Sequence, residues 1–164
     1  KEIFEETTIV RLDVLFGKND GLFFRFGKII KLLPMIPLPK GSKAMFTPLF
    51  VKDAAYAIEK IVKSKIFHGK VFELFGPKSY SWEELMIFFK KNIHSKVFLI
   101  KVPITLLSFP ALFFGFLPNP LITIDQLRRF KVRVEYDKKN LTMKDLSIKT
   151  SSIETEMPKY LKNF

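Results

Sequence analysis

A nearly continuous apolar segment near the start of the chain, TTIVRLDVLFG from Thr7 to Gly17, constrains the fold most. Its apolar residues are Ile9, Val10, Leu12, Val14, Leu15 and Phe16, of which Ile9, Val10 and Val14 are β-branched. Strands covered on both faces carry such runs, whereas a strand with one face in water alternates apolar and polar residues. The segment therefore predicts a buried strand of a parallel sheet that ends in a turn at Gly17.

The composition predicts one compact globular unit. The chain has 164 residues, and 48% of them are hydrophobic, which excludes a mainly disordered protein. Because there is no cysteine, the chain has no disulfide, thiol nucleophile or cysteine-ligated metal, and it fits a reducing compartment. The only histidines, His68 and His94, are far apart in the sequence, so no metal site is predicted.

The chain is strongly basic. It has 28 Lys and Arg against 16 Asp and Glu, a formal net charge of +12, which suits an anionic partner such as nucleic acid, acidic lipid or an acidic protein. The lysines are scattered, and no zinc-finger spacing, aromatic-basic RNA motif or basic helix with heptads accompanies them. Nucleic acid is therefore not a predicted partner.

The first half of the chain reads as alternating helices and strands. Apolar spacing predicts a helix within 21–33, which the prolines from Pro34 onward stop before an extended loop. Strands are predicted at 46–51 and 71–75, with a turn at Gly76 and Pro77. Between them Asp53 is expected to N-cap a helix over 54–65. The expected inward face of that helix is Ala54, Ala57, Ile58, Ile61 and Val62.

The second half reads as mostly helical. Ser81 and Glu84 form a capping box before a helix to about Asn92. The expected core face of this helix is Trp82, Leu85, Met86 and Phe89. A similar pattern, Thr123-Ile124-Asp125-Gln126, predicts a helix through Phe130 with Ile124 and Leu127 inward. Ser151 and Glu154 are expected to cap a last helix, which Pro158 interrupts or restarts.

Five segments in this order resemble one protein family. They are TTIVRLDVLFG, FTPLFVKDAAYAI, GKVFELFGPKSYSWEEL, PLITIDQL and SSIETEMPKYLKNF. Their order and spacing are similar to the atypical branch of the extended short-chain dehydrogenase/reductase superfamily. That branch includes the nucleotide-binding accessory subunit of respiratory complex I and bacterial relatives known as NAD-dependent epimerases/dehydratases. One departure is Leu12, which stands where the family usually has proline.

The resemblance implies an α/β fold, the C-terminal part of a Rossmann-like doubly wound fold with a small α-rich substrate-side lobe. Residues 1–76 would supply late strands and helices of the sheet, and 77–164 a mostly helical lobe. The implied cofactor is NAD or NADP. However, the first glycine is Gly17, so the sequence holds no Gly-x-Gly-x-x-Gly fingerprint for a phosphate cradle. We therefore expect a cofactor-gripping half upstream, and no tight dinucleotide binding by this chain alone.

Candidate cofactor contacts lie where the first strand ends. Ligands of open α/β sheets bind beyond the carboxyl ends of parallel strands. That rule selects four residues: Arg11, Leu12, Asp13 and Phe16. Arg11 has an equally simple alternative role, as one partner of a structural ion pair.

No catalytic residue and no metal ligand is predicted. Tyr56 and Lys60 have the Tyr-x-x-x-Lys spacing that places a phenol beside an ammonium for proton transfer. In the family, the catalytic pair precedes the strand that corresponds to residues 7–17. Here Tyr56 and Lys60 follow that strand, so we expect them to lie on a partly exposed helix face without a catalytic role. Two acidic pairs have structural explanations. Glu5-Glu6 flanks the first predicted strand, and Glu83-Glu84 belongs to the helix cap that begins at Ser81.

From Val97 to Ile124 the only charged residue is Lys101. Three prolines, Pro103, Pro110 and Pro118, interrupt this segment, and its apolar core from Val102 to Leu117 is shorter than the roughly 20 residues of a membrane-spanning helix. Two interpretations remain open. The segment forms a core helix of the lobe, or a helix that lies on a bilayer or on a hydrophobic subunit.

Three functions follow from the resemblance. The first is a structural or assembly role in membrane-bound NADH:quinone oxidoreductase, without catalysis by this chain alone. The second is the substrate-side half of an NAD(P)-dependent epimerase, dehydratase or reductase, and the third is a nonfunctional truncated product. Expected partners are complex I subunits or the missing N-terminal half, with a possible acidic membrane surface. The expected location is the cytoplasm or the mitochondrial matrix, possibly peripheral on the inner membrane.

Overall fold

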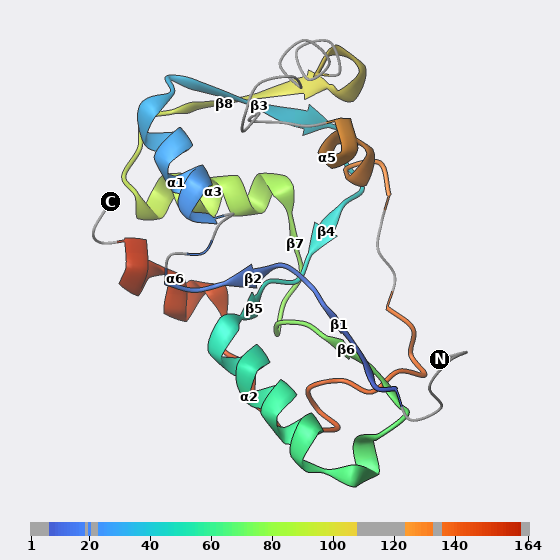
Figure 1. Ribbon diagram of the computed structural model, residues 1–164. Coiled ribbons are helices and arrows are strands. Elements are labelled where there is room, and N and C mark those ends of the chain that lie inside the picture. Colours follow the sequence, from blue (N-terminus) through green and yellow to red (C-terminus); the bar gives the residue numbers. More distant parts are fainter. Residues whose placement is uncertain (1–6, 19, 21–22, 108–123, 133–135, 162–164) are drawn as a thin grey trace. The chain divides into compact units, whose positions relative to one another are not determined.

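A computed structural model describes residues 7–18, 20, 23–107, 124–132 and 136–161 (Figure 1). The chain forms two units, each assembled from segments far apart in the sequence. The first unit combines residues 1–24, 46–79 and 135–163, and the second combines 25–45 and 80–134. Each unit thus contains residues from both predicted parts, 1–76 and 77–164. The predicted boundary after residue 76 stays a prediction.

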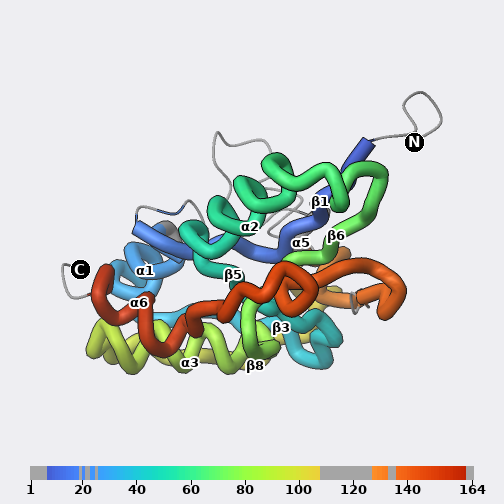
Figure 2. The backbone as a smooth tube through the Cα atoms, turned by 90° about the horizontal axis from the view of Figure 1, so that it is seen from below, coloured from blue at the N-terminus to red at the C-terminus, as the bar shows by residue number. Residues whose placement is uncertain are grey.

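The sheet of the first unit is parallel, as predicted. β1 (Ile9–Leu12) pairs with β6 (Val71–Leu74), and Figure 2 shows these two strands side by side. β2 (Leu15–Phe16) pairs in parallel with β5 (Leu49–Phe50). The long strand predicted over residues 7–17 is thus two short strands separated at Asp13 and Val14.

Two features of the first predicted strand were wrong. It is not continuous, because the Asp13 carboxylate accepts hydrogen bonds from the backbone N–H groups of Val14 and Thr47 at the break. It is also not fully buried. Ile9 and Val10 are half-buried, and Leu12 is 40% exposed.

The helix α2 (Val51–Lys63), followed by the 3-10 turn η1 (Lys65–Phe67), covers the core of the first unit. That core consists of Leu49, Ala54, Ala57, Ile61, Phe72, Leu74, Met143 and Leu146. The predicted inward positions of Ile58 and Val62 were wrong, since these side chains are exposed. The predicted cap was also wrong. The helix begins directly after β5, and Asp53, inside its first turn, accepts a hydrogen bond from Ser151 N.

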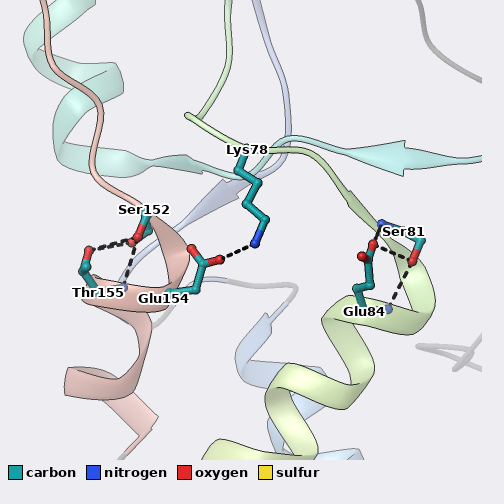
Figure 3. A network of polar contacts seen from close by, with 6 residues as sticks. All are labelled: Lys78, Ser81, Glu84, Ser152, Glu154 and Thr155. Carbon is teal, nitrogen blue, oxygen red and sulfur yellow. Dashed lines mark hydrogen bonds and ion pairs between the residues drawn. The ribbon is translucent and has the colours of Figure 1, made fainter.

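The last helix, α6 (Ile153–Leu161), begins one residue later than a cap at Ser151 predicts. Ser152, not Ser151, accepts from the backbone N–H of Thr155, and Glu154 pairs with Lys78 at 3.0 Å (Figure 3). The predicted interruption at Pro158 was wrong, because the helix continues through it. Proline removes one internal hydrogen bond, and buried side chains on both sides of it hold the helix in place. They are Ile153, Met157 and Leu161.

The second unit contains a two-stranded parallel ribbon and helices. β3 (Met35–Lys40) pairs along its whole length with β8 (Phe98–Pro103), as Figure 1 shows. β3 replaces the extended loop predicted there, because Pro37 and Pro39 are tolerated in a strand that pairs on one side only. β8 corrects the helical expectation for 98–103, whereas 108–123 of that segment lie outside the described residues.

The predicted helices of this unit are confirmed. α1 (Phe23–Leu32) lies within the predicted range, and α3 (Trp82–Asn92) has the predicted capping box and buries its predicted face. The ring of Trp82 packs edge-on against Phe26 and Phe130, with centroids 4.7 and 5.5 Å apart. α5 (Ile124–Arg129) buries Leu127, as expected. The expectations for Thr123 and for the side chain of Ile124 lie outside the described part of the chain.

Two short strands, β4 (Met45–Phe46) and β7 (Tyr80–Ser81), lie where the chain passes between the two units. Among the helices of the described residues, none is long and apolar enough to cross a membrane. The predicted strand flank at Glu5 and Glu6 lies outside the described ranges.

Candidate functional site

One polar centre of the first unit is the carboxylate of Asp13, directly after β1. Its Oδ2 accepts hydrogen bonds from the backbone N–H of Thr47 at 2.7 Å and from the phenol of Tyr136 at 2.5 Å. The hydroxyls of Thr47 and Tyr136 lie 2.9 Å apart. These three residues, which we call the strand-end cluster, join the end of β1 to segments that follow it by 34 and 123 positions.

Tyr136 donates its proton within this cluster. Its ring packs on Phe75, with centroids 4.3 Å apart. Burial, and then the hydrogen bond to the Asp13 carboxylate, raise the pKa of Tyr136 above its ordinary value. A phenol with a raised pKa stays neutral at physiological pH and is a poor general base. Tyr136 therefore holds the C-terminal segment against β1 and is not poised for proton abstraction.

A second polar centre, Glu73, lies on β6 opposite Arg11 of β1. The Glu73 residue is only 6% exposed. Its Oε1 accepts from Arg11 Nη1 and Asn140 Nδ2, each at 3.0 Å, and its Oε2 accepts from the Asp137 backbone N–H at 2.9 Å. We call these four residues the Glu73 hub. A buried carboxylate needs such partners to offset its lost hydration.

The four residues predicted to contact a cofactor have different surroundings in the structure. Arg11 forms the ion pair that was its alternative role, and Asp13 belongs to the strand-end cluster. Leu12 is partly exposed, whereas Phe16 is fully buried, with its ring 5.4 Å from that of Phe50. Their contact with a cofactor stays a prediction.

Sequence reasoning missed Glu73, Thr47 and Tyr136. Glu73 interrupts an otherwise apolar strand, and such an interruption is a signal that a buried partner exists. Thr47 and Tyr136 gave no comparable signal, because their bonds to Asp13 depend on long-range folding.

The start of α1 is not an open phosphate site. A phosphate grip of the dinucleotide-binding kind needs free backbone N–H groups at a helix N-terminus. At the start of α1, Asp20 Oδ1 accepts from the N–H groups of Phe23 and Phe24, at 2.5 and 3.3 Å. The chain's own carboxylate thus lies where a phosphate would bind.

The other sequence candidates have structural roles. Tyr56 is 56% exposed on α2, and Lys60 Nζ donates to the carbonyl oxygen of Leu146 at 2.7 Å, which confirms the expected helix face. Glu84 completes the capping box of α3 (Figure 3), and Glu83 pairs with Lys101 at 2.9 Å. Among the described residues, no three His, Cys, Asp or Glu side chains are grouped as metal ligands would be.

The sequence is similar to curated subunits of mitochondrial NADH-ubiquinone oxidoreductase. The chain is 27% identical to the 40 kDa subunit of mitochondrial NADH-ubiquinone oxidoreductase from Neurospora crassa, over 100% of this chain and 43% of that protein. It is also 27% identical to the mitochondrial NADH dehydrogenase [ubiquinone] 1 alpha subcomplex subunit 9 of Dictyostelium discoideum, over 96% of this chain and 45% of that protein. The chain is a homologue of these subunits. It spans less than half of their length, and no family model matches it.

Solved structures agree on the fold. The chain superposes with a TM-score of 0.61 on dTDP-4-dehydrorhamnose reductase from Bacillus anthracis in complex with NADP, at 17% identity, covering 99% of this chain and 50% of that one. A nucleoside-diphosphate-sugar epimerase from Staphylococcus aureus gives 0.61 at 15% identity, covering 92% and 51%. The predicted Rossmann-like α/β fold is therefore confirmed. In sequence, the chain is similar to the complex I subunits that the resemblance indicated.

Proposed function

We propose that this chain has a structural or assembly role in a membrane-bound NADH:quinone oxidoreductase, as the C-terminal portion of a reductase-like NAD(P)-binding protein. The observation that carries the proposal is the similarity to the 40 kDa subunit along the whole chain. The proposed partners are subunits of that enzyme, together with the upstream half of the fold that the resemblance implies. The proposed location is the matrix or cytoplasmic face of the inner membrane.

The polar contacts of the first unit support a structural role. The strand-end cluster and the Glu73 hub use carboxylate, phenol and amide groups to bind other parts of the same unit. In particular, the phenol of Tyr136 is held neutral by burial and by Asp13. The chemistry of these groups suits holding the C-terminal segment in place.

The cofactor proposal concerns the complete fold. NAD or NADP supplies hydride chemistry or structural stabilisation where this family binds it. We propose that the upstream half grips the dinucleotide and that Arg11, Leu12, Asp13 and Phe16 border its pocket. At the start of α1, the Asp20 carboxylate already accepts from the helix N–H groups, so we expect the phosphate grip to come from the upstream half.

Deleting the gene and measuring the amount of assembled NADH:quinone oxidoreductase on a native gel tests the structural role. We expect the assembled enzyme to fall after deletion and to recover with the wild-type chain. The Tyr56→Phe variant should restore assembly equally well, because this exposed phenol has no role in folding. Unchanged assembly after deletion would contradict the proposal.

The second candidate is the substrate-side half of an NAD(P)-dependent epimerase, dehydratase or reductase. The superposition on sugar-nucleotide reductases and epimerases favours it. Mixing the chain with its upstream half and following NAD(P)H absorbance with nucleotide sugars tests this candidate. Turnover that requires both halves would support it. Absence of turnover, with assembly lost on deletion, would favour the structural role.

A further inference from the structure

The positive charge of the chain is concentrated in one unit. The second unit has 13 Lys and Arg against 3 Asp and Glu, a net +10, whereas the first has 15 against 13, a net +2. No acidic residue occurs within 25–45 or between Glu84 and Asp125. These carboxylate-free ranges include both strands of the β3–β8 ribbon.

The same ribbon exposes large apolar side chains. Met35 lies opposite Phe98 in the parallel ladder, and they are 52% and 69% exposed. Two positions further along, Pro37 lies opposite Ile100, which is 39% exposed. Residues two apart on a strand share a face, so these side chains form one apolar surface. Leu32, 79% exposed at the end of α1, comes just before it in the chain. We call Leu32, Met35, Phe98 and Ile100 the ribbon face.

Cations lie close to the ribbon face. Lys96 is exposed two positions before Phe98. Beside β8, a groove of about 750 Å³ is lined by Phe98 and by Lys90, Lys91 and Lys101, with one acid, Glu83, which pairs with Lys101. Exposed aliphatic and aromatic side chains next to an excess of lysines are the composition of interfacial membrane-binding surfaces.

We infer that the ribbon face binds the surface of a bilayer rich in acidic phospholipids. Phe98, Met35 and Leu32 would enter the headgroup region, while Lys91 and Lys96 contact the lipid phosphates. The inference deepens the proposed function and rests on it for its membrane setting. An acidic protein would satisfy the lysines, but large apolar side chains exposed at 52% to 79% favour the acyl boundary of a bilayer.

Vesicle flotation of the full chain tests this inference. We expect binding to vesicles of equal parts phosphatidylcholine and phosphatidylglycerol, loss of that binding in high salt, and little binding to pure phosphatidylcholine. Each of Leu32→Ser, Met35→Ser and Phe98→Ser should weaken partitioning of the chain onto acidic vesicles by about tenfold, because each variant removes apolar surface that would enter the bilayer. Lys91→Gln and Lys96→Gln should each cost about fivefold.

The first unit provides a matched control. Val62 and Ile66 are 71% and 68% exposed, so Val62→Ser and Ile66→Ser remove similar apolar surface from the other unit. These variants should float like the wild type. Because Trp82 is the only tryptophan and is buried in the second unit, its fluorescence shows whether each ribbon variant is folded.

Direct insertion can be read with a single label, because the chain has no cysteine. The Phe98→Cys variant carrying an environment-sensitive fluorophore should shift its emission to the blue with acidic vesicles, and the labelled Val62→Cys variant should not. Equal behaviour of the two labels, or unchanged flotation of folded ribbon variants, would overturn the inference.

The outcomes separate this inference from the proposed function. Ribbon variants that lose vesicle binding but still enter the assembled enzyme in detergent support both. If the wild-type chain does not bind acidic vesicles, and ribbon variants fail to enter the enzyme, the ribbon face is a protein interface and the lipid inference is overturned. If vesicle binding holds but deletion leaves assembly unchanged, the proposed function alone fails.

Discussion

The two units use charge differently. In the first unit, lysines are balanced by nearby carboxylates, as in the pairs Lys63–Glu59, Lys78–Glu154 and Lys159–Glu156. In the second unit, Lys101 pairs with Glu83, and the unit keeps a net charge of +10 from 13 basic and 3 acidic residues. The difference lies in the carboxylates, because the numbers of basic residues are similar.

Exposed apolar side chains occur in both units. The charged residues near them differ, so we interpret the two surfaces differently. Val62 and Ile66 lie near Lys63 and Glu59, which neutralise each other. Phe98 and Met35 lie in segments that contain no acid. Apolar exposure alone is common on protein surfaces, whereas its combination with uncompensated positive charge indicates an anionic, apolar partner.

The largest effect on this comparison should come from Glu73→Ala in the first unit. Removing the buried carboxylate breaks its hydrogen bonds with Asp137 and Asn140 and its ion pair with Arg11, and we expect a loss of about 3 kcal/mol in the free energy of unfolding. Urea unfolding followed by circular dichroism measures it. The exposed Glu59→Ala variant is the control and should change stability by less than about 0.5 kcal/mol. Equal stability of the two variants would show that the Glu73 hub is not structural.

Gly76→Ala should have the next largest effect. A Cβ at Gly76 would overlap the carbonyl oxygen of Pro48, so the backbone must move at a cost of about 2 kcal/mol. Gly41→Ala is the comparison in the second unit. A Cβ there meets nothing within 4 Å, and only the positive φ of 78° opposes it, with a cost of about 1 kcal/mol. A reversed order in thermal unfolding would contradict the packing around Gly76.

Tyr136→Phe tests the strand-end cluster, with an expected loss of about 1.5 kcal/mol from the hydrogen bond to the Asp13 carboxylate. The raised pKa of Tyr136 adds a pH dependence. Above about pH 10 the unfolded chain loses this phenol proton first, so the folded state binds more protons and stability falls as pH rises. Urea midpoints measured through this range should fall less steeply in Tyr136→Phe. Parallel curves for the two proteins would exclude this role.

The smallest effects should come from the helix caps, one in each unit (Figure 3). Ser81→Ala removes the capping box of α3, and Ser152→Ala removes the acceptor at the start of α6. Each should cost about 1 kcal/mol. Trp82 fluorescence should detect the Ser81→Ala change directly because it lies in the same unit. If Ser152→Ala shifts the Trp82 transition equally, the two units unfold together.

Local patterns in the sequence predicted local structure well. The capping box at Ser81 and Glu84 and the core face of α3 depend on residues within one helix, and both are present. The parallel pairing of the first strand also followed from its apolar run. The cap at Asp53 was wrong because its carboxylate bonds Ser151, which is distant in the sequence. Competition from such long-range partners is invisible to a local pattern.

The polar part of the site was harder to predict. Asp13 was selected because it follows a strand, but Thr47 and Tyr136 reach it only after folding. The alternative role of Arg11 was correct, since its strand neighbour is Glu73. The ribbon face was missed because prolines in 34–39 suggested a loop, whereas pairing with β8 makes this segment a strand.

The most direct test of a structural role in NADH:quinone oxidoreductase is co-migration. Membranes from cells that carry the gene are solubilised in mild detergent and separated on a native gel, with an antibody against this chain and an in-gel stain for NADH dehydrogenase activity. We expect the chain to migrate with the active high-mass band. Migration of the chain only at low mass, apart from that activity, would contradict the proposed function.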